Sequence, residues 1–553
     1  MTLANDWWRG ALIYQVYPRS FKDANGDGVG DLAGIIERLP YIADLGVDAV
    51  WLSPIFTSPM KDFGYDVSNY RDIDPLFGTL SAFDELVAKA HSLNLKVMID
   101  QVLSHTSDQH AWFKESRASR NNPKANWYIW ADANADGSPP NNWLSVFSGS
   151  AWTWDSRRKQ YYLHNFLAEQ PDLNFHNPEV QDQVLSDLVF WLDRGVDGFR
   201  FDTANYFHHD TELRANPPVA SAATDLQLPA NPYEMQRHVY DKNRPENLAF
   251  FERVRKVLDA YGAASVGEVG DAEALDLMVD YTSGGNRLHM TYSFAFLNKE
   301  GHADWVRRHA RDFETAAARA GGLSWPCWSV GNHDSMRVLS RWEGLEHPKS
   351  FTRMVAAMLS CMRGSVCWYQ GDELSLPEVE LPFEALQDPP GIALWPEYKG
   401  RDGCRTPMPW ESTLPHAGFS PDTIDATWLP VGKAHYPLAV DQAQADPDAA
   451  LHFVRGFWTW RRTQPALVGG DVTYLDSGRD VMALIRHAPH NKPSQSWLCV
   501  FNMAGRSLTV DMADWPAHEA SEIPELPDYQ AGLREGEHLT LPPYGIYLAA
   551  LSV

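Results

Sequence analysis

The chain has 553 residues and carries 47 Lys and Arg against 72 Asp and Glu, which gives a formal net charge of −25. Its 44% apolar and 22% charged residues are ordinary for a globular protein and exclude disordered and fibrous classes. The length exceeds the roughly 250–300 residues at which one hydrophobic core stops growing, so we expect two or three domains. The acid excess argues against nucleic acid and anionic membranes as partners, since both recruit clustered Lys and Arg.

The first residues contain neither a basic region nor an apolar stretch, so we expect no signal peptide. No apolar run approaches the length that spans a membrane. The five cysteines are odd in number and scattered, which favours buried thiols in a reducing compartment over disulfides. We therefore predict a cytoplasmic protein. The cysteines are Cys327, Cys361, Cys367, Cys404 and Cys499.

Short apolar runs alternate with amphipathic helical segments along the first four-fifths of the chain. For example, Phe83, Leu86, Val87 and Ala90 have the spacing of one helix face. Eight such runs, most followed by a helical pattern, predict an α/β fold, a (β/α)₈ TIM barrel. The predicted strands are Ala11–Pro18, Val47–Pro54, Leu95–Leu103, Gly195–Thr203, Ala263–Gly270, Met290–Ala295, Pro326–Asp334 and Ser365–Glu373.

Two interruptions define the predicted domains. About 90 residues separate the third and fourth strands, and the Trp-, Asn- and Ser-rich segment 104–172 within them predicts a small inserted domain after strand 3. After a helix near residues 448–467, short alternating segments predict a C-terminal antiparallel β-sandwich domain over 468–553. The barrel then comprises 1–103 and 173–467. Gly- and Pro-rich stretches at 208–232 and 376–440 are expected to be loops that shape a pocket.

Acidic residues stand at the carboxyl ends of three predicted strands, where barrel enzymes place their active sites. These residues are Asp202, Glu268 and Asp334. Paired carboxylates that flank one bond are typical of glycoside hydrolysis, in which one group protonates the leaving oxygen and the other attacks. Arg200, two residues before Asp202, faces the same side of the strand and is expected to keep that carboxylate ionised. Glu268 needs a raised pKa to carry a proton.

An Asp-rich segment near the N-terminus has the spacing of an EF-hand-like loop. Asp23, Asn25, Asp27 and Asp31 occupy positions 1, 3, 5 and 9, and the carbonyl of Val29 is available at position 7. Position 12 is a glycine, so the loop is not a complete EF-hand. Hard oxygen ligands at this spacing predict a structural Ca²⁺ or Mg²⁺. The alternative is a polar turn whose acids are solvated.

Six separated motifs in the same order resemble the alpha-amylase family of glycoside hydrolases, and within it the oligo-1,6-glucosidase and alpha-glucosidase branch. They are GYDVSNY (64–70), DQVLSHTS (100–107), QPDLNF (170–175), GFRFDTANY (198–206), GEVG (267–270) and GNHDS (331–335). The resemblance covers roughly residues 6–410. It implies a catalytic barrel with an inserted domain and a C-terminal β-sandwich, no organic cofactor, and a small α-glucoside or oligosaccharide substrate. The stretch RDGCRTPMPW and the opening IYQVYPRSFKDANGDGVGDLAGI strengthen the assignment to this branch.

The resemblance also implies roles for individual residues in a retaining double displacement. Asp202 is the expected nucleophile, Glu268 the acid/base and Asp334 the residue that binds two hydroxyls of the distorted sugar. The other residues expected to bind the sugar are Asp62, Tyr65, His105, His333 and Arg401, with Arg405 as a second candidate for the role of Arg401. Arg401 would close the pocket and make the enzyme exo-acting. Phe147 and Phe166 are candidates for the pocket wall, with core packing as the alternative. Relatives also hold a structural cation at the Asp-rich loop.

Two positions carry information on specificity. Relatives that cleave alpha-1,6 bonds tend to have Val directly after the nucleophile, whereas Thr or Ala accompanies alpha-1,4 preference. Thr203 therefore predicts an alpha-1,4-preferring alpha-glucosidase that releases glucose from maltose-like substrates and also transfers it. The family usually has Asn before the strand-3 histidine, whereas this chain has Ser104, which disfavours a calcium ion between the barrel and the inserted domain.

Three alternatives and one property stay open. A sugar isomerase or a dedicated alpha-glucosyltransferase would use the same glucosyl-enzyme and differ only in what captures it. An inactive glucosidase-like binding protein would normally lack the acids that this chain retains. The oligomeric state, monomer or homodimer, is not determined by the sequence.

Overall fold

The computed structural model describes residues 6–219, 229–271, 274–297, 301–489, 495–515 and 532–551. Eight parallel strands form one sheet in the order β11-β10-β9-β5-β2-β1-β13-β12, and a parallel bridge between Thr291 and Pro326 joins its two edges into a barrel. All eight lie inside the ranges expected from the sequence. They are β1 (Leu12–Val16), β2 (Ala49–Leu52), β5 (Lys96–Gln101), β9 (Gly198–Phe201), β10 (Ala264–Val269), β11 (Met290–Ser293), β12 (Cys327–Ser329) and β13 (Ser365–Tyr369).

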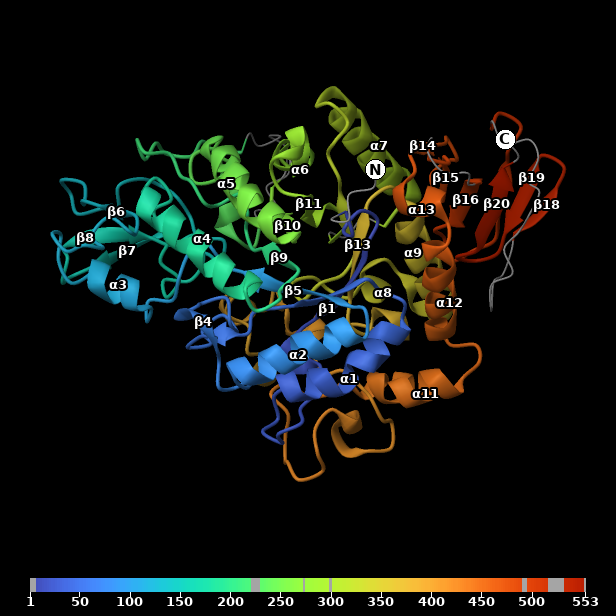
Figure 1. Ribbon diagram of the computed structural model, residues 1–553, viewed down its shortest axis with the longest axis horizontal. Coiled ribbons are helices and arrows are strands. Elements are labelled where there is room, and N and C mark those ends of the chain that lie inside the picture. Colours follow the sequence, from blue (N-terminus) through green and yellow to red (C-terminus); the bar gives the residue numbers. More distant parts are fainter. Residues whose placement is uncertain are drawn as a thin grey trace.

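Helices connect successive strands and cover the outside of the barrel (Figure 1). The main ones are α1 (Leu32–Asp44), α2 (Leu80–Ser92), α4 (Pro178–Leu192), α5 (Glu246–Tyr261), α6 (Ala274–Thr282), α7 (Ala303–Arg319), α9 (Pro348–Cys361) and α12 (Ala450–Arg462). In α2 the buried positions are Phe83, Leu86, Val87 and Ala90, as the spacing predicts. Shorter helices are α3 (Ala111–Ser116), α8 (Val338–Arg341), α10 (Pro389–Ala393), α11 (Val440–Ala445) and α13 (Pro465–Gly469).

Side chains along each barrel strand point alternately into the barrel and outward to the helices. This alternation decides which side chains reach the site. In β9, Phe199 and Phe201 pack outward into the core shared with the helices, because side chains alternate along a strand. Arg200, between them, faces the barrel interior and is fully buried. Asp202 follows directly at the carboxyl end of the strand.

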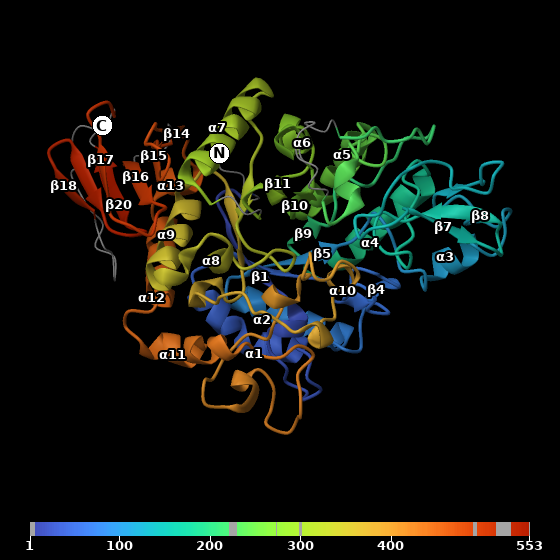
Figure 2. The same cartoon turned by 180° about the vertical axis from the view of Figure 1, so that it is seen from behind.

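Small antiparallel sheets flank the barrel at opposite ends of the molecule (Figure 1, Figure 2). One lies within 104–172 and contains β6 (Trp130–Ala131), β7 (Trp152–Asp155) and β8 (Gln160–Leu163). A two-stranded ribbon of β3 (Phe56–Thr57) and β4 (Asn69–Ile73) lies between β2 and α2 in the chain. The predicted domain boundaries at 103/104, 172/173 and 467/468 stay a prediction.

The C-terminal segment forms two facing sheets. One contains β14 (Val472–Tyr474), β15 (Val481–Arg486), β16 (Ser496–Asn502) and β20 (Ile546–Leu551), and the other β17 (Leu508–Asp511), β18 (Leu533–Glu535) and β19 (His538–Leu541). Val481 and Ala483 of β15 pack with Leu539 of β19 in a core between the sheets, whereas Met482 and Leu484 face the main core. Burial on both faces explains why β15 is apolar from Val481 to Ile485.

All five cysteines are buried free thiols, as expected. Within the described ranges, no helix is long and apolar enough to cross a membrane.

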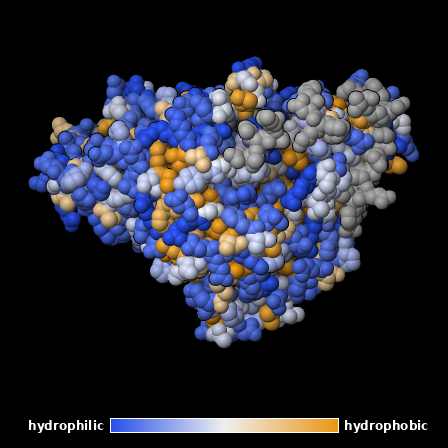
Figure 3. All heavy atoms as spheres, viewed as in Figure 1, coloured by the Kyte–Doolittle hydropathy of each residue, from blue (hydrophilic) through white to orange (hydrophobic). Residues whose placement is uncertain are grey.

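The predicted loop at 376–440 contains only short helical turns and α10 besides irregular chain, whereas residues 220–228 of the predicted loop at 208–232 lie outside the described residues. The face in Figure 3 is mostly hydrophilic, with apolar side chains gathered over its middle.

Candidate active site

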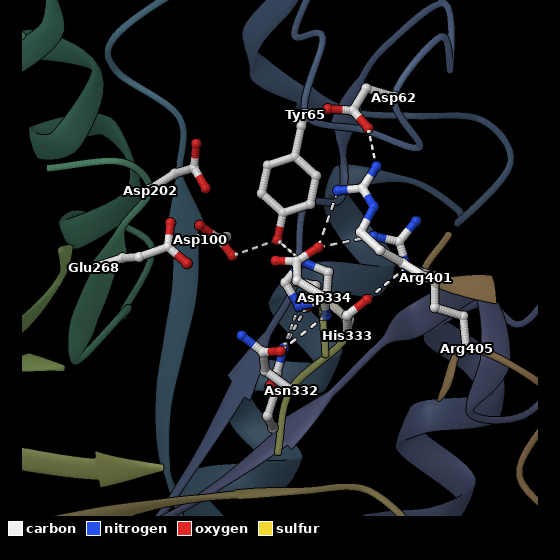
Figure 4. Close-up of polar contacts among 12 residues, drawn as sticks. Asp62, Tyr65, Asp100, Asp202, Glu268, Asn332, His333, Asp334, Arg401 and Arg405 are labelled. Carbon is white, nitrogen blue, oxygen red and sulfur yellow. Dashed lines mark hydrogen bonds and ion pairs between the residues drawn. The ribbon is translucent and has the colours of Figure 1, made fainter. Parts of the chain in front are cut away.

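A pocket opens at the carboxyl ends of the barrel strands and collects most of the residues predicted from the sequence. Those that line it are Asp62, Tyr65, His105, Phe147, Phe166, Asp202, Thr203, Glu268, Asp334 and Arg401. Arg200 and His333 are not on the lining and lie fully buried beneath it. Strands, connecting loops and the inserted segment therefore all contribute to one cavity. Figure 4 shows polar residues from the strand ends and the connecting loops.

One guanidinium holds the predicted nucleophile and acid/base together. Arg200 Nη1 lies 2.6 Å from Asp202 Oδ1 and 2.8 Å from Asp100 Oδ1. Its Nη2 forms an ion pair with Glu268 and donates to the Tyr292 hydroxyl at 3.0 Å. That hydroxyl donates to Glu268 Oε1 at 2.9 Å. Three carboxylates thus share one cation, and Asp100 and Tyr292 join the site without having been assigned a role from the sequence.

Burial decides the charge state of the two central carboxyl groups. It raises the pKa of Glu268 to about 7, as a general acid requires, although Arg200 opposes the shift. Arg200 does lower the pKa of Asp202, as expected, but it does not keep the net pKa of that group low. Burial, with the negative charges of Asp100 and Asp334, outweighs the guanidinium and raises the pKa of Asp202 to about 7.

The third acid has the opposite environment. Asp334 Oδ1 lies 3.0 Å from Arg401 Nη1 and 2.9 Å from Arg405 Nη2. These two guanidinium groups, together with His333, hold the pKa of Asp334 well below its ordinary value even though the group is buried. Asp334 is therefore ionised across the neutral pH range and accepts hydrogen bonds only.

Arg401 lines the pocket and lies among the carboxylates of Asp62, Asp334 and Asp388. Its Nη2 lies 3.0 Å from Asp62 Oδ1, and its Nε lies 2.9 Å from Asp388 Oδ1. Asp388 also accepts from the backbone N–H of Arg401 at 3.0 Å and is fully buried. Arg405 lies beside the clamp and donates to the His333 carbonyl and to Asp334. Asp388 was not predicted, because it lies in an irregular loop without any periodic pattern.

Tyr65 and His333 form a stack under the pocket. Their rings are almost parallel, with centroids 5.3 Å apart, and the Tyr65 hydroxyl lies 2.6 Å from His333 Nε2. His333 Nδ1 lies 2.8 Å from Gln15 Nε2. Both ring nitrogens of His333 therefore have protein partners, so this histidine supports Tyr65 and Asp334 from below, whereas the resemblance places it on the sugar. Figure 4 shows the Tyr65 ring between the Asp202–Glu268 pair and Arg401.

Thr203 connects the carboxyl groups of Asp202 and Glu268. Its backbone N–H donates to Glu268 Oε2 at 3.1 Å, and its Oγ1 lies 3.3 Å from Asp202 Oδ2. Its φ of +43° is a left-handed conformation that β-branched residues rarely adopt. Backbone strain of this kind is found where the surroundings hold a residue for function. Thr203 Oγ1 also lies 3.0 Å from the hydroxyl of Ser104.

The remaining wall is mainly apolar. Phe147 and Phe166 line the pocket with their ring centroids 5.5 Å apart, so they face the cavity as predicted. Sequence reasoning missed Gln170, whose Nε2 lies 3.1 Å from Asp62 Oδ2 and 3.2 Å from His105 Nε2. Gln170 is the first residue of the QPDLNF motif, so that motif could have identified Gln170 as a site residue from the sequence. The other missed lining residues are Val146, Tyr206, Gly270 and Phe294.

The Asp-rich loop lies at the start of α1, and its acids accept backbone hydrogen bonds. Asp23 accepts from the N–H groups of Gly26 and Gly28, and Asp27 accepts from that of Val29. Asp31 caps α1 and also accepts from the N–H groups of residues 24 and 25, and the Asn25 side chain accepts from that of residue 27. Over the described residues, no group of three or more His, Cys, Asp or Glu side chains is arranged to hold a metal ion. The donors are all hard oxygens, which suit Ca²⁺ or Mg²⁺, and the predicted cation stays a prediction.

This combination of a (β/α)₈ barrel and converging acids defines a glycoside hydrolase site, and comparison with known proteins gives the family. The family described as "Alpha amylase, catalytic domain" matches residues 15–470. The chain belongs to the alpha-amylase family of glycoside hydrolases, in the alpha-glucosidase branch.

Individual relatives differ in the reactions their names describe. A probable alpha-glucosidase of Rhizobium meliloti is 51% identical over 99% of this chain and 97% of its own length. An oligo-1,6-glucosidase of Halalkalibacterium halodurans is 34% identical over 91% of each chain. The crystal structure of the alpha-glucosyl transfer enzyme XgtA has a TM-score of 0.92 at 49% identity, over 99% of both chains. That of trehalulose synthase MutB from Pseudomonas mesoacidophila has a TM-score of 0.86 at 30% identity, also over 99% of both.

Proposed function

We propose that this protein is an exo-acting, retaining alpha-glucosidase that releases alpha-glucose from the non-reducing end of short alpha-1,4-linked oligosaccharides such as maltose. The observation that carries the proposal is the buried pair of Asp202 and Glu268, held by Arg200 at a pocket that Arg401 and its partner Asp62 also line. A carboxyl pair on one cation favours the close spacing of a retaining pair over the wider spacing that admits an inverting water.

In the first step, Asp202 attacks the anomeric carbon and forms a covalent glucosyl ester. The glycosidic C–O bond breaks, and Glu268 donates its proton to the leaving oxygen. The raised pKa of Glu268 supports this role, because the group retains its proton near neutrality. Tyr292 and the N–H of Thr203 donate to the two oxygens of Glu268 and orient the carboxyl group.

In the second step, Glu268 acts as a base. It removes a proton from water, whose oxygen attacks the anomeric carbon while the bond to Asp202 breaks. The two displacements return the alpha configuration. Asp334, ionised and held by Arg401 and Arg405, is placed to accept hydrogen bonds from sugar hydroxyls and to stabilise the positive charge that develops on the ring.

The closed end supports exo action and a small substrate. Asp62, Arg401 and Asp334 form a continuous chain of ion pairs where a second sugar beyond the terminal glucose would have to pass. Such a wall admits one glucose unit and binds it through charge-assisted hydrogen bonds. Thr203, directly after the nucleophile, supports the alpha-1,4 preference on the basis of the family resemblance.

The decisive experiment follows the anomeric form of the product by NMR with maltose, isomaltose, sucrose, trehalose and maltotriose as substrates. We expect initial alpha-glucose from maltose and maltotriose and slower release from isomaltose. Asp202→Asn should reduce kcat by at least about 10⁴-fold with little change in Tm. Asp136→Asn, an exposed acid in the inserted segment, is the matched control and should behave as wild type. Full activity in Asp202→Asn, or initial beta-glucose, contradicts the mechanism, and inactivity of the wild type favours the binding-protein alternative.

A dedicated alpha-glucosyltransferase or sugar isomerase is the second candidate. It is favoured by the 49% identity to a glucosyl transfer enzyme, by the likeness to a trehalulose synthase, and by the aromatic wall of Phe147, Phe166 and Phe294 beside the acids. Apolar surface favours a sugar or alcohol acceptor over water at that position. Product analysis at high maltose, with and without an added alcohol, separates the candidates. Predominantly free glucose supports the hydrolase, whereas predominantly glucosides or isomeric disaccharides support the alternative.

A further inference from the structure

Ser104 departs from the usual strand-3 motif of the family, and the mechanism above gives it no role. Its side chain is buried three residues after the end of β5 and is not part of the pocket lining. Its Oγ lies 2.9 Å from Nδ1 of His105 and 3.0 Å from Oγ1 of Thr203. Thr203 Oγ1 lies 3.3 Å from Asp202 Oδ2. Ser104 and Thr203 are therefore the two inner members of a polar chain that joins His105 to Asp202.

The direction of the hydrogen bonds follows from the end groups. An ionised carboxylate only accepts, so the Thr203 hydroxyl donates to Asp202. Thr203 Oγ1 then accepts from Ser104, and Ser104 accepts from Nδ1 of His105. This tautomer leaves His105 Nε2 as an acceptor, and the amide Nε2 of Gln170 lies 3.2 Å away to donate, whereas the Tyr65 carbonyl oxygen, 3.0 Å from the same nitrogen, receives no proton from it. Every donor in the chain therefore faces an acceptor when the nucleophile is ionised.

The hydrogen bonds of the same chain can also run in the opposite direction, from Asp202 toward His105. When Asp202 is protonated, it donates toward Thr203, which donates to Ser104, which donates to His105 Nδ1. His105 then carries its proton on Nε2, which lies 3.0 Å from the carbonyl oxygen of Tyr65. A hydroxyl group both donates and accepts, so two hydroxyl groups in series serve either charge state of the carboxyl group without moving.

The chain ends on a different oxygen of the nucleophile from the one that Arg200 binds. Arg200 contacts Oδ1 of Asp202, whereas the hydroxyl chain reaches Oδ2. The two contacts together fix the rotation of the carboxyl group. The other charged groups that face Asp202 are the carboxyl groups of Asp100, Asp334 and Glu268. All three carboxyl groups disfavour a negative charge on Asp202. A hydrogen bond donated to Oδ2 therefore stabilises the ionised form of Asp202.

We propose that Ser104 is a positioning residue for the nucleophile, which holds the Thr203 hydroxyl against Asp202 and links the protonation state of Asp202 to the tautomer of His105. This inference rests on the proposed glucosidase function, because its readout is the hydrolysis of an alpha-glucoside. Ser104 does not touch the substrate, so its effect is expected in the pH profile and in kcat, with KM nearly unchanged.

The first test measures kcat/KM against pH for Ser104→Ala. Without Ser104, the Thr203 hydroxyl loses the donor that polarises it, so the acid limb of the profile should move upward by about 0.5–1 pH unit. Ser104→Asn should restore the wild-type limb, because its amide donates to Thr203 while its carbonyl accepts from His105. Ser104→Cys, a weaker donor, should fall between them and serves as a second variant should the alanine variant be unstable.

The second test is a double-mutant cycle with Thr203→Val, which removes the hydroxyl at nearly constant shape. Adding Ser104→Ala to Thr203→Val should shift the acid limb no further, because the chain is already broken. Ser265→Ala is the matched control. Ser265 is also buried in the barrel with a histidine Nδ1 at 3.0 Å, that of His289, and it is not in the pocket. It should leave the acid limb in place.

The outcomes of these tests distinguish a positioning role of Ser104 from a failure of the proposed function. A shift in Ser104→Ala that persists at full size in the Thr203→Val background overturns the proposal, since Ser104 would then act by another route. So does a profile identical to that of Ser265→Ala. A wild-type protein that hydrolyses no alpha-glucoside contradicts the proposed function itself, whereas an active wild type with an unaltered Ser104→Ala profile contradicts only the positioning role.

Discussion

Arg401 Nη2 lies 3.0 Å from Asp62 Oδ1, an ion pair that joins segments 339 residues apart. Both side chains are nearly buried, and the same guanidinium reaches Asp334 and Asp388. Because water is largely excluded, loss of Arg401 would leave the Asp62 carboxylate buried without its cationic partner, which is more costly than breaking an exposed pair. The closed end that we propose for the pocket therefore depends on a contact between two distant loops.

Replacing Arg401 tests this closure. We expect Arg401→Ala to lower kcat/KM for maltose by about 100-fold or more, because Asp62 and Asp334 lose their shared partner. Arg401→Lys keeps the charge without the planar fork and should lose less. Lys399→Ala removes an exposed cation two residues away and is the control. Steady-state kinetics measure the effect, and wild-type kcat/KM in Arg401→Ala would mean that the clamp does not bind the terminal glucose.

Thr203→Val tests linkage preference. The substitution replaces the hydroxyl that faces Asp202 with a methyl group at nearly constant shape, and the family resemblance associates Val with alpha-1,6 cleavage. We expect the ratio of kcat/KM for maltose to that for isomaltose to fall by about tenfold, a change of roughly 1.4 kcal/mol in transition-state discrimination. The measurement is a direct comparison of the two disaccharides. An unchanged ratio would contradict the assignment of linkage specificity to Thr203.

The pH dependence of activity follows from the two raised pKa values. Activity needs Asp202 ionised and Glu268 protonated, and burial raises the pKa of each to about 7. As pH falls below 7, Asp202 gains a proton; as pH rises above 7, Glu268 loses one. We therefore expect a narrow bell-shaped profile of kcat/KM centred near pH 7, the two limbs belonging to the coupled pair.

A nitrophenyl alpha-glucoside provides the control for that profile. Its leaving group departs without protonation, so the fall on the alkaline side should flatten while the acid limb stays in place. A broad plateau from about pH 5 to 9 with maltose would show that the two groups do not titrate near neutrality.

Chelation tests the predicted cation at the Asp-rich loop. If Ca²⁺ or Mg²⁺ binds there, a chelator should lower Tm while leaving activity at low temperature largely intact, because the loop caps α1 away from the pocket. Asp27→Ala should lower Tm by itself and abolish the response to the chelator. Rapid loss of activity with no change in Tm would contradict a structural cation at this position.

The sequence by itself determined the barrel and the identity of its acids. All eight strands and the buried face of α2 appear where local periodicity predicts them, because burial of one face imposes a period that the chain must carry. Asp202, Glu268 and Asp334 were identifiable because strand ends in a parallel barrel converge at one face. Family motifs added Asp62, Tyr65 and Arg401, which the structure places on the same pocket.

Only the tertiary structure decided how these groups share charge. Asp388 and Arg401 meet in an irregular loop that leaves no periodic trace in the sequence. His333, expected on the sugar, is enclosed by Tyr65 and Gln15. The pKa of Asp202 depends on burial and on every carboxylate and guanidinium that the barrel brings near it, so the lowering effect of the adjacent Arg200 did not by itself predict the net rise. Electrostatic energy sums over distances in space, whereas the sequence shows only neighbours along the chain.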